Sequence, residues 1–441
     1  MKPLSTLLLA GLLGLSSGML YAESAANTPS ESSSKELNAD VQTELSLYEL
    51  IQQGFDDFAK ARGIHFGSVT PQGVYYTTSY AVVNENLNSP NFINSRAMAY
   101  ERAYLNAVSD HICRYYGIQS SKLINEYFSD ESSDRLQNPL ISESPETRIG
   151  KKLEVLLETQ IDNALRELNV DPSLYTEKPL EAKRTLLQDA ITRQTMTSAF
   201  GSAAGLLPVQ TLEARLADGS YAVGIILRYD PALCGVAQSL AAKQLPMLAA
   251  TGGITPEEAL PSEEEMVQSF GVRMFFDRNG RPALLGFGQW EVSNAGTDTQ
   301  AKERAKLRAL EQATDIANSG LTLFITGNAS FNKISETGEI LEENAFFQPS
   351  GAVRSETVNS IVDKIWKNAS IQGIDTLQGR STIYSKILKH PSGQQVAVVA
   401  VVWSFDELKQ VRPGSVPTGT QPTQNIQPED SGIRKSRIYD F

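Results

Sequence analysis

The chain contains few of the residues that metal and redox chemistry draw on. Its 441 residues include only three histidines and two cysteines. His65, His111 and His390 are far apart in sequence, and only His111 lies near a cysteine, in His111-Ile112-Cys113. Two residues that are two positions apart on a helix point in different directions, so this pair is a weak metal-binding pattern. We therefore expect no metal site and no cofactor.

Motifs for nucleotide binding and acyl transfer are also missing from the sequence. Gly286-Phe287-Gly288 lacks the third glycine of a dinucleotide-binding loop, and no Walker A lysine motif occurs. The pattern G-x-S-x-G occurs at residues 14–18, inside a predicted signal peptide that is removed. The 51 acidic residues are too many for a catalytic pair to be selected from sequence. We nominate no catalytic residue and expect a protein that is not an enzyme.

The chain has no excess of basic charge and no long apolar run after its N-terminus. It has 39 basic and 51 acidic residues and a formal charge of −12, which lacks the electrostatic footprint of a nucleic-acid-binding protein. Residues 1–22 combine one lysine, an apolar run and a terminal alanine, the pattern of a secretory signal peptide cleaved after Ala22. No later segment is apolar for long enough to span a membrane. We expect a periplasmic protein without a transmembrane segment in the mature chain.

The two cysteines favour a disulfide, because the periplasm is an oxidising compartment. Cys113 and Cys234 would close a loop of about 120 residues, which stabilises a fold by about 4–5 kcal/mol in the chain-entropy model. The alternative is that both are separate, buried free thiols.

A nonapeptide that occurs twice is the main evidence for the architecture. Residues 99–107 read AYERAYLNA and residues 301–309 read AKERAKLRA. In both copies alanines recur at every fourth position, which places them on one face of a helix and lets the helix approach a sheet closely. The surrounding hairpin patterns recur in the same order, so we predict a duplicated α+β module with a small antiparallel or mixed sheet in each copy.

The predicted organisation has five parts after the signal peptide. A flexible leader and an N-terminal helix (41–62) occupy residues 23–62, and an acidic linker at residues 241–270 separates the two modules, which span residues 63–240 and 271–408. Residues 409–441 are a tail that we expect to be disordered because it is rich in Pro, Thr, Gln and Gly.

Elements within the modules are predicted from turn signals and periodicity. Hairpins are expected around residues 71–73 and around residues 277–280. The first module has two further helical stretches, near residues 146–169 and 179–200, whereas the second has a strand at LTLFITG (321–327) and a helix near residues 353–369.

A strand, an alanine-striped helix with the A-x-E-R-A rhythm and a closing hairpin together resemble the small domain of some Gram-negative envelope proteins. These are the N-terminal domain of the flagellar assembly protein FlgT and related outer-membrane lipoproteins. The resemblance covers about 60 residues in each copy. It implies a small α+β fold that is used in envelope assemblies and has no catalytic residues.

The chain ends in RKSRIYDF, a basic and then aromatic sequence. An extended peptide can add a strand to the edge of a sheet and use aromatic side chains as anchors. The partner-docking candidates are Arg437, Ile438, Tyr439 and Phe441. The alternative is a tail without a binding role.

These observations favour a non-enzymatic structural or assembly component of a cell-envelope machine of the secretion, conjugation, pilus or flagellar type. Its partners would be other envelope proteins. Two alternatives stay open: a periplasmic hydrolase that uses carboxylates on envelope polymers, and a solute- or peptide-binding protein that uses the cleft between the modules.

Overall fold

The computed structural model describes residues 45–127, 153–154, 156–242, 244–293, 297–336, 358, 362, 378–406 and 432–436. Contacts divide the chain into residues 1–44 and residues 45–441, and every described residue belongs to the second unit. The predicted signal peptide and the predicted leader up to residue 44 therefore lie outside the described residues. No described helix has the length and apolar character that a membrane crossing requires.

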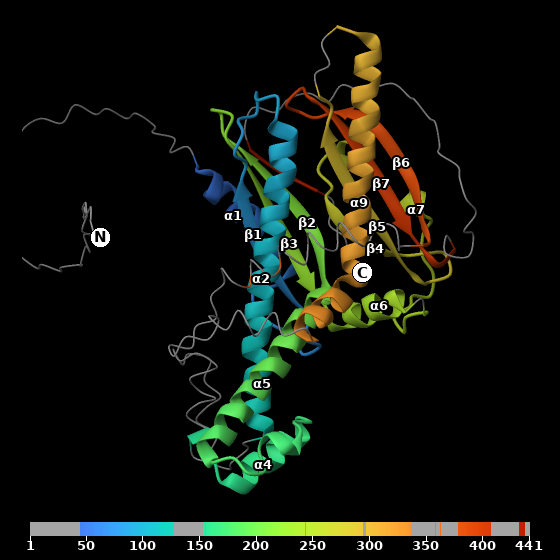
Figure 1. Ribbon diagram of the computed structural model, residues 1–441. Helices are drawn as coiled ribbons and strands as arrows, with labels where there is room; N and C mark the ends of the chain where they lie inside the picture. Colours follow the sequence, from blue (N-terminus) through green and yellow to red (C-terminus); the bar gives the residue numbers. More distant parts are fainter. Residues whose placement is uncertain are drawn as a thin grey trace, which may run out of the picture. The chain divides into compact units, whose positions relative to one another are not determined.

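Within the described residues, helices combine with two antiparallel four-stranded sheets, which confirms the predicted α+β class. The first sheet has the strand order β1-β3-β2-β8 and the second has the order β4-β5-β7-β6 (Figure 1). The strands are β1 (Tyr75–Val82), β2 (Leu206–Arg215), β3 (Tyr221–Tyr229), β4 (Gly271–Phe276), β5 (Pro282–Glu291), β6 (Arg380–Lys389), β7 (Gln395–Trp403) and β8 (Gly432–Lys435). The helices are α1 (Leu47–Arg62), α2 (Phe92–Tyr127), α4 (Glu158–Glu167), α5 (Leu180–Ser202), α6 (Pro231–Ala241), α7 (Pro256–Ala259), α8 (Glu263–Met266) and α9 (Thr299–Glu336).

The strands of both sheets belong to parts of the chain with the same order of elements. A strand (β1 or β5) is followed by a long helix (α2 or α9), and a hairpin (β2–β3 or β6–β7) comes later in the chain; in the first part α4 and α5 lie between the long helix and the hairpin. The second strand of the hairpin pairs with the first strand of the succession, which gives the orders β1-β3-β2 and β5-β7-β6. Helix α2 packs on β1 and β3, and α9 packs on β5 and β7 (Figure 1). Duplication of one module is our interpretation of this common order.

Two predicted strands are not formed. Of the hairpin predicted around residues 71–73 only the second strand, β1, is present, because residues 63–74 form turns instead of a strand, with Gly73 N donating to Thr70 O at 2.8 Å. LTLFITG is helical and continues α9. Its apolar side chains suit a buried helix as well as a strand, and Leu321 lies against Gly286 of β5 on the helix-covered face of the second sheet.

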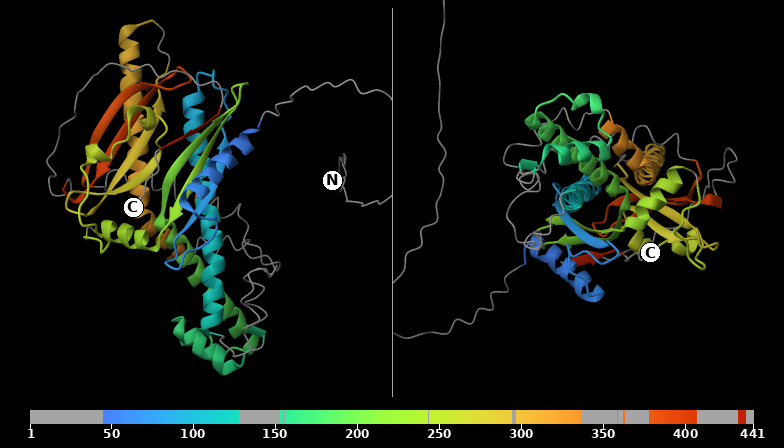
Figure 2. Two further views of the ribbon diagram at one scale, coloured as in Figure 1. Left: turned by 180° about the vertical axis from the view of Figure 1, so that it is seen from behind. Right: turned by 90° about the horizontal axis from the view of Figure 1, so that it is seen from below.

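Helix α1 and helix α2 cover opposite faces of the first sheet (Figure 2). Side chains of β3 alternate between the two faces, because successive residues of a strand point in opposite directions. Val223 and Ile225 belong to the cluster that contains the α2 residues, whereas Ala222 and Ile226 pack with α1. The predicted N-terminal helix is confirmed as α1, which begins after a capping box formed by Ser46 and Glu49.

The sheets share one hydrophobic cluster. It joins Val223 of the first sheet to Phe287 and Val398 of the second. The stretch predicted as a linker contains α7 and α8 and contributes buried residues to this cluster: Met266, Val267 and Phe270. The predicted boundary between the modules is therefore part of the packed interior.

Small residues set the distance between α9 and the second sheet. A Cβ atom added at Gly288 would lie 1.8 Å from the carbonyl oxygen of Ala313, so the helix backbone rests directly on β5. The buried alanines of α9 are Ala309, Ala313 and Ala317. The buried stripe thus begins at Ala309, the last residue of the repeated nonapeptide, and the backbone contact lies one turn further on at Ala313, since Ala301 and Ala305 are only half-buried.

We expect Gly288→Ala to destabilise the fold by about 3 kcal/mol, because overpacking at a backbone-to-backbone contact has no flexible side chain to displace. Chemical denaturation followed by circular dichroism measures this loss. Gly235→Ala is the matched control, because nothing lies within 4 Å of its added Cβ in helix α6. The control should stabilise the protein by about 0.5–1 kcal/mol. Equal effects of the two substitutions would contradict the close approach.

Candidate functional site at the edge of strand β2

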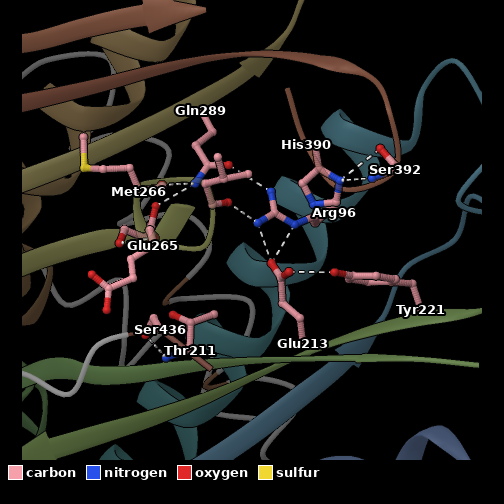
Figure 3. A network of polar contacts seen from close by, with 12 residues as sticks. Arg96, Thr211, Glu213, Tyr221, Glu265, Met266, Gln289, His390, Ser392 and Ser436 are labelled. Carbon is pink, nitrogen blue, oxygen red and sulfur yellow. Dashed lines mark hydrogen bonds and ion pairs between the residues drawn. The ribbon is translucent and has the colours of Figure 1, made fainter. Parts of the chain in front are cut away.

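A fully buried arginine joins the two sheets. Arg96 lies in the first turns of α2, and its Nε donates to Glu213 Oε1 of β2 at 2.6 Å. Its Nη1 donates to Gln289 Oε1 of β5 at 2.9 Å, and its Nη2 donates to the carbonyl oxygen of Val267 (Figure 3). The ring of Phe270 lies 4.6 Å from the guanidinium carbon. One cation therefore holds α2, both sheets and the segment between them.

The partners of Arg96 are themselves fixed. Glu213 Oε2 accepts from Tyr221 Oη at 2.6 Å, and Gln289 Nε2 donates to the carbonyl oxygens of Ser269, at 2.8 Å, and Met266, at 3.1 Å (Figure 3). Glu213 and Gln289 are each only 1 % exposed. A buried charge is tolerated only when it is paired and hydrogen-bonded, and this network meets that condition.

Sequence reasoning missed these three residues. Glu213 and Gln289 both interrupt apolar strand patterns, LEA and FGQW, which is a usable signal for a buried polar pair. Neither strand reveals its partner, because the three residues come from elements that are distant in the chain.

The predicted disulfide is not formed in the structure, where Cys113 and Cys234 are half-buried and not bonded to each other. Cys113 lies on α2, and Cys234 lies in the first turn of α6, where its Sγ donates to the carbonyl oxygen of Ser202 at 3.7 Å. Burial raises the pKa of the Cys234 thiol to about 11, which disfavours the thiolate that disulfide chemistry requires.

His111, a weak candidate for a metal ligand in the sequence, lies in a chain of buried hydrogen bonds. Its Nδ1 contacts Tyr75 Oη, and its Nε2 lies 2.7 Å from Ser202 Oγ, which donates to the carbonyl oxygen of Ala199 at 2.6 Å. Ser202 has one hydrogen, and that hydrogen points to Ala199. The imidazole must therefore donate through Nε2 and accept from Tyr75 through Nδ1. Burial lowers the pKa of His111 to about 3, in agreement with a neutral ring.

This arrangement limits the chemistry available at Ser202. A nucleophilic serine donates its hydrogen bond to the histidine beside it and gives up that proton in the reaction, whereas Ser202 accepts a hydrogen bond from His111 and donates its own to Ala199 O. Within the described part of the chain, no group of three or more His, Cys, Asp or Glu side chains is placed to hold a metal ion.

The tail contains a strand where disorder was expected. β8 pairs antiparallel with the edge of β2, with Lys435 opposite Leu212 and Gly432 opposite Arg215. The prediction of a disordered tail is therefore wrong for residues 432–436, and the stretches 407–431 and 437–441 lie outside the described residues. So do the docking candidates Arg437, Ile438, Tyr439 and Phe441. The strand addition seen in the structure is to the chain's own sheet, and the proposed docking of residues 437–441 on a partner stays a prediction.

Ser436 fixes the end of this strand. It is 3 % exposed, and its N donates to Thr211 O at 2.9 Å while its Oγ accepts from Thr211 N at 2.8 Å (Figure 3). Its carbonyl oxygen accepts from Gln210 Nε2 at 3.0 Å. A buried side chain at the end of a short strand determines its register.

The side chains of β8 alternate between two surroundings. Ile433 lies over Gly54 of α1, where an added Cβ would be 3.5 Å from the Ile433 methyl group, and Lys435 Nζ donates to Asp57 Oδ2 at 2.9 Å. Arg434 points to the other face. There Gln268, with its amide oriented so that both ends are satisfied, accepts from Arg434 at 2.9 and 3.0 Å and donates to Lys435 O at 2.9 Å.

We define the β2 edge site as residues 210–215 of β2 with Gly54, Asp57 and Gln268. It presents a backbone ladder, a space for a branched apolar side chain, a carboxylate for a lysine and a buried place for a hydroxyl group. These are the parts of a site for an extended peptide.

Comparisons with known proteins match a region that contains the β2 part of this site. Residues 147–242 match a family described as a domain of unknown function (DUF6844), and this range includes β2. The crystal structure of a hypothetical protein from Francisella tularensis is similar at 19 % identity and a TM-score of 0.52, covering 84 % of this chain and 95 % of that chain. This similarity indicates a common fold. A search of curated proteins finds no match.

We expect Arg96→Met to destabilise the protein by about 3–5 kcal/mol, because it leaves Glu213 buried without its cation. The double variant Arg96→Met/Glu213→Gln has no unpaired buried carboxylate at position 213. Its free energy of unfolding should therefore be at least about 1 kcal/mol higher than that of Arg96→Met. Urea denaturation of the set gives the coupling. Arg102→Met on the same helix, whose exposed guanidinium donates to Val82 O, should cost about 1 kcal/mol or less. Simple additivity of the two buried substitutions would refute the pairing.

The two buried histidines predict the direction of the pH dependence of stability. Burial also lowers the pKa of His390 well below its ordinary value, with Arg96 adding to the effect. The unfolded chain takes up protons near pH 6.5 that the folded chain does not, so stability is complete above that pH and falls as the pH drops toward the folded pKa values.

Between about pH 7.5 and about pH 5.5 each buried histidine should lower the free energy of unfolding by about 1.4 kcal/mol. His111→Asn should remove one such contribution from the difference between urea titrations at the two values. An unchanged pH difference in the variant would show that folding does not lower the pKa of His111.

Proposed function

We propose that this protein is a non-enzymatic structural or assembly component of a cell-envelope machine of the secretion, conjugation, pilus or flagellar type, and that it works in the periplasm. The observation that carries the proposal is β8 on the edge of β2, where an extended segment is held by both its backbone and its side chains. Strand addition is a common way for proteins to bind extended segments of their partners.

One feature of the interior supports the assembly role over the alternative of a ligand cleft between the modules. Arg96, Glu213 and Gln289 fill the place where the sheets meet, which supports a rigid join at that point. The signal-peptide pattern and the resemblance to the FlgT N-terminal domain support the envelope as the place of action.

The proposal is tested by crosslinking in exporting cells. The tagged full-length chain is compared with a chain that lacks residues 433–441 and with a chain that lacks residues 2–22 and stays in the cytoplasm. We expect mass spectrometry to recover a defined envelope protein with the exported full-length chain and not with the chain that is retained. Failure of the exported chain to enrich any envelope protein over the retained chain would refute the assembly role.

The truncated chain separates two forms of this role. Loss of the partner on removal of residues 433–441 assigns the contact to the tail itself. Recovery of the same partner with both exported chains keeps the assembly role and places the contact outside the tail.

A further inference from the structure

The β2 edge site recognises side chains as well as backbone. The side chain of Ile433 packs over Gly54, Lys435 forms an ion pair with Asp57, and the buried hydroxyl group of Ser436 accepts a hydrogen bond from Thr211 N. Each of these contacts depends on a different chemical property: branched apolar shape, positive charge and a small hydroxyl group. A strand that served only to cover an edge needs the backbone ladder alone.

The connection between β8 and the preceding strand does not by itself force β8 into this site. β8 is joined to the last described residue of the second module, Asp406, through residues 407–431 and not through a two-residue hairpin turn. A segment tethered within one chain competes through an effective concentration that is on the order of 1 mM for a flexible tether. The same contacts are therefore available to a segment that arrives from another molecule.

The position of Arg434 is the poorest match in the tail strand. Its positive charge acts on His390 together with those of Arg96 and Arg215, and the nearby carboxylate of Glu213 is already paired with Arg96. Arg434 Nη1 is buried and makes no hydrogen bond to a described residue. An uncharged side chain at this position would avoid the unpaired donor.

We propose that the β2 edge site is an exchangeable strand site, in which residues 432–436 are a built-in occupant that an extended segment of a partner protein displaces. This inference rests on the proposed function and specifies its contact. The displacing segment carries, in order, a branched apolar, an uncharged polar, a basic and a hydroxyl side chain.

A second copy of this chain is a poorer occupant than a partner protein. The tail of a second copy is identical to the tail already in place, so both have the same intrinsic affinity for the site. The tail of the same chain then wins because its effective concentration is higher. A partner segment that differs at position 434 gains that difference.

The test uses the full-length chain and a labelled peptide of residues 430–441. Ser436→Pro in the chain removes the backbone donor to Thr211 O and the hydroxyl acceptor, so it should release the tail. We expect this variant to bind the peptide about tenfold or more tightly than the unaltered chain. Ser415→Pro, which adds a proline in the connecting stretch, is the control and should behave like the unaltered chain.

Specificity is tested by exchanging charges between peptide and site. A Lys435→Glu peptide should bind the Ser436→Pro chain several-fold more weakly, and Asp57→Lys in that chain should restore its affinity. An Arg434→Gln peptide should bind at least as tightly as the unaltered peptide. Hydrogen exchange at the Thr211 amide provides a second measurement, since the amide should lose protection in Ser436→Pro and regain it with peptide.

Three results would overturn the inference. The first is an absence of peptide binding to Ser436→Pro at about 1 mM peptide while the Thr211 amide exchanges freely. The second is equal binding to all chains. The third is concentration-dependent dimerisation of the unaltered chain that Ser436→Pro abolishes, which would assign the site to exchange between copies. None of the three contradicts recovery of an envelope partner by both exported chains, so the proposed function can survive the loss of this inference.

Discussion

The rest of the structure depends on keeping one guanidinium group out of water. Arg96 is fully buried, and a buried cation is stable only when carboxylate and carbonyl groups surround it. Its acceptors come from β2, from β5 and from the segment before β4, so none of them can complete the site alone. The two sheets must therefore fold against each other. Glu213, one of these acceptors, lies on the strand that receives β8, so the join between the sheets and the β2 edge site share one element.

Close packing of helix on sheet explains why the architecture was readable in the sequence. Alanines at every fourth residue predict a helix that approaches a sheet, and Gly286 and Gly288 supply the complementary surface on β5. The same local rules failed at LTLFITG, because an apolar run with β-branched residues fits a strand and a buried helix equally well. Leu321 is helical because α9 continues across the face of β5, a tertiary fact that a window of seven residues does not contain.

The candidate site was only partly predictable for a related reason. Composition indicated that the tail was disordered, but four residues with a few specific partners suffice to order a strand when a sheet edge is available. Cysteine count favoured a disulfide, yet bonding requires proximity and orientation, and Cys234 instead donates to Ser202 O. Arg96, Glu213 and Gln289 are single polar residues in apolar surroundings, so the sequence identifies each as unusual without pairing them.

The occupied edge also bears on how such a protein avoids unwanted association. An exposed strand edge is a template for pairing with any other strand, and natural proteins cover or interrupt such edges. A tethered segment on β2 protects this edge from pairing with other strands. The segment competes with them at an effective concentration on the order of 1 mM, so its own affinity for the edge determines how strong the protection is. In the exchange that we propose, this competition excludes a random strand that binds the open edge weakly, whereas a segment that matches Asp57 and Thr211 and leaves no unpaired donor at position 434 has the additional affinity needed to displace β8. In that exchange, the unpaired donor of Arg434 makes displacement by a specific partner easier without opening the edge to non-specific ones.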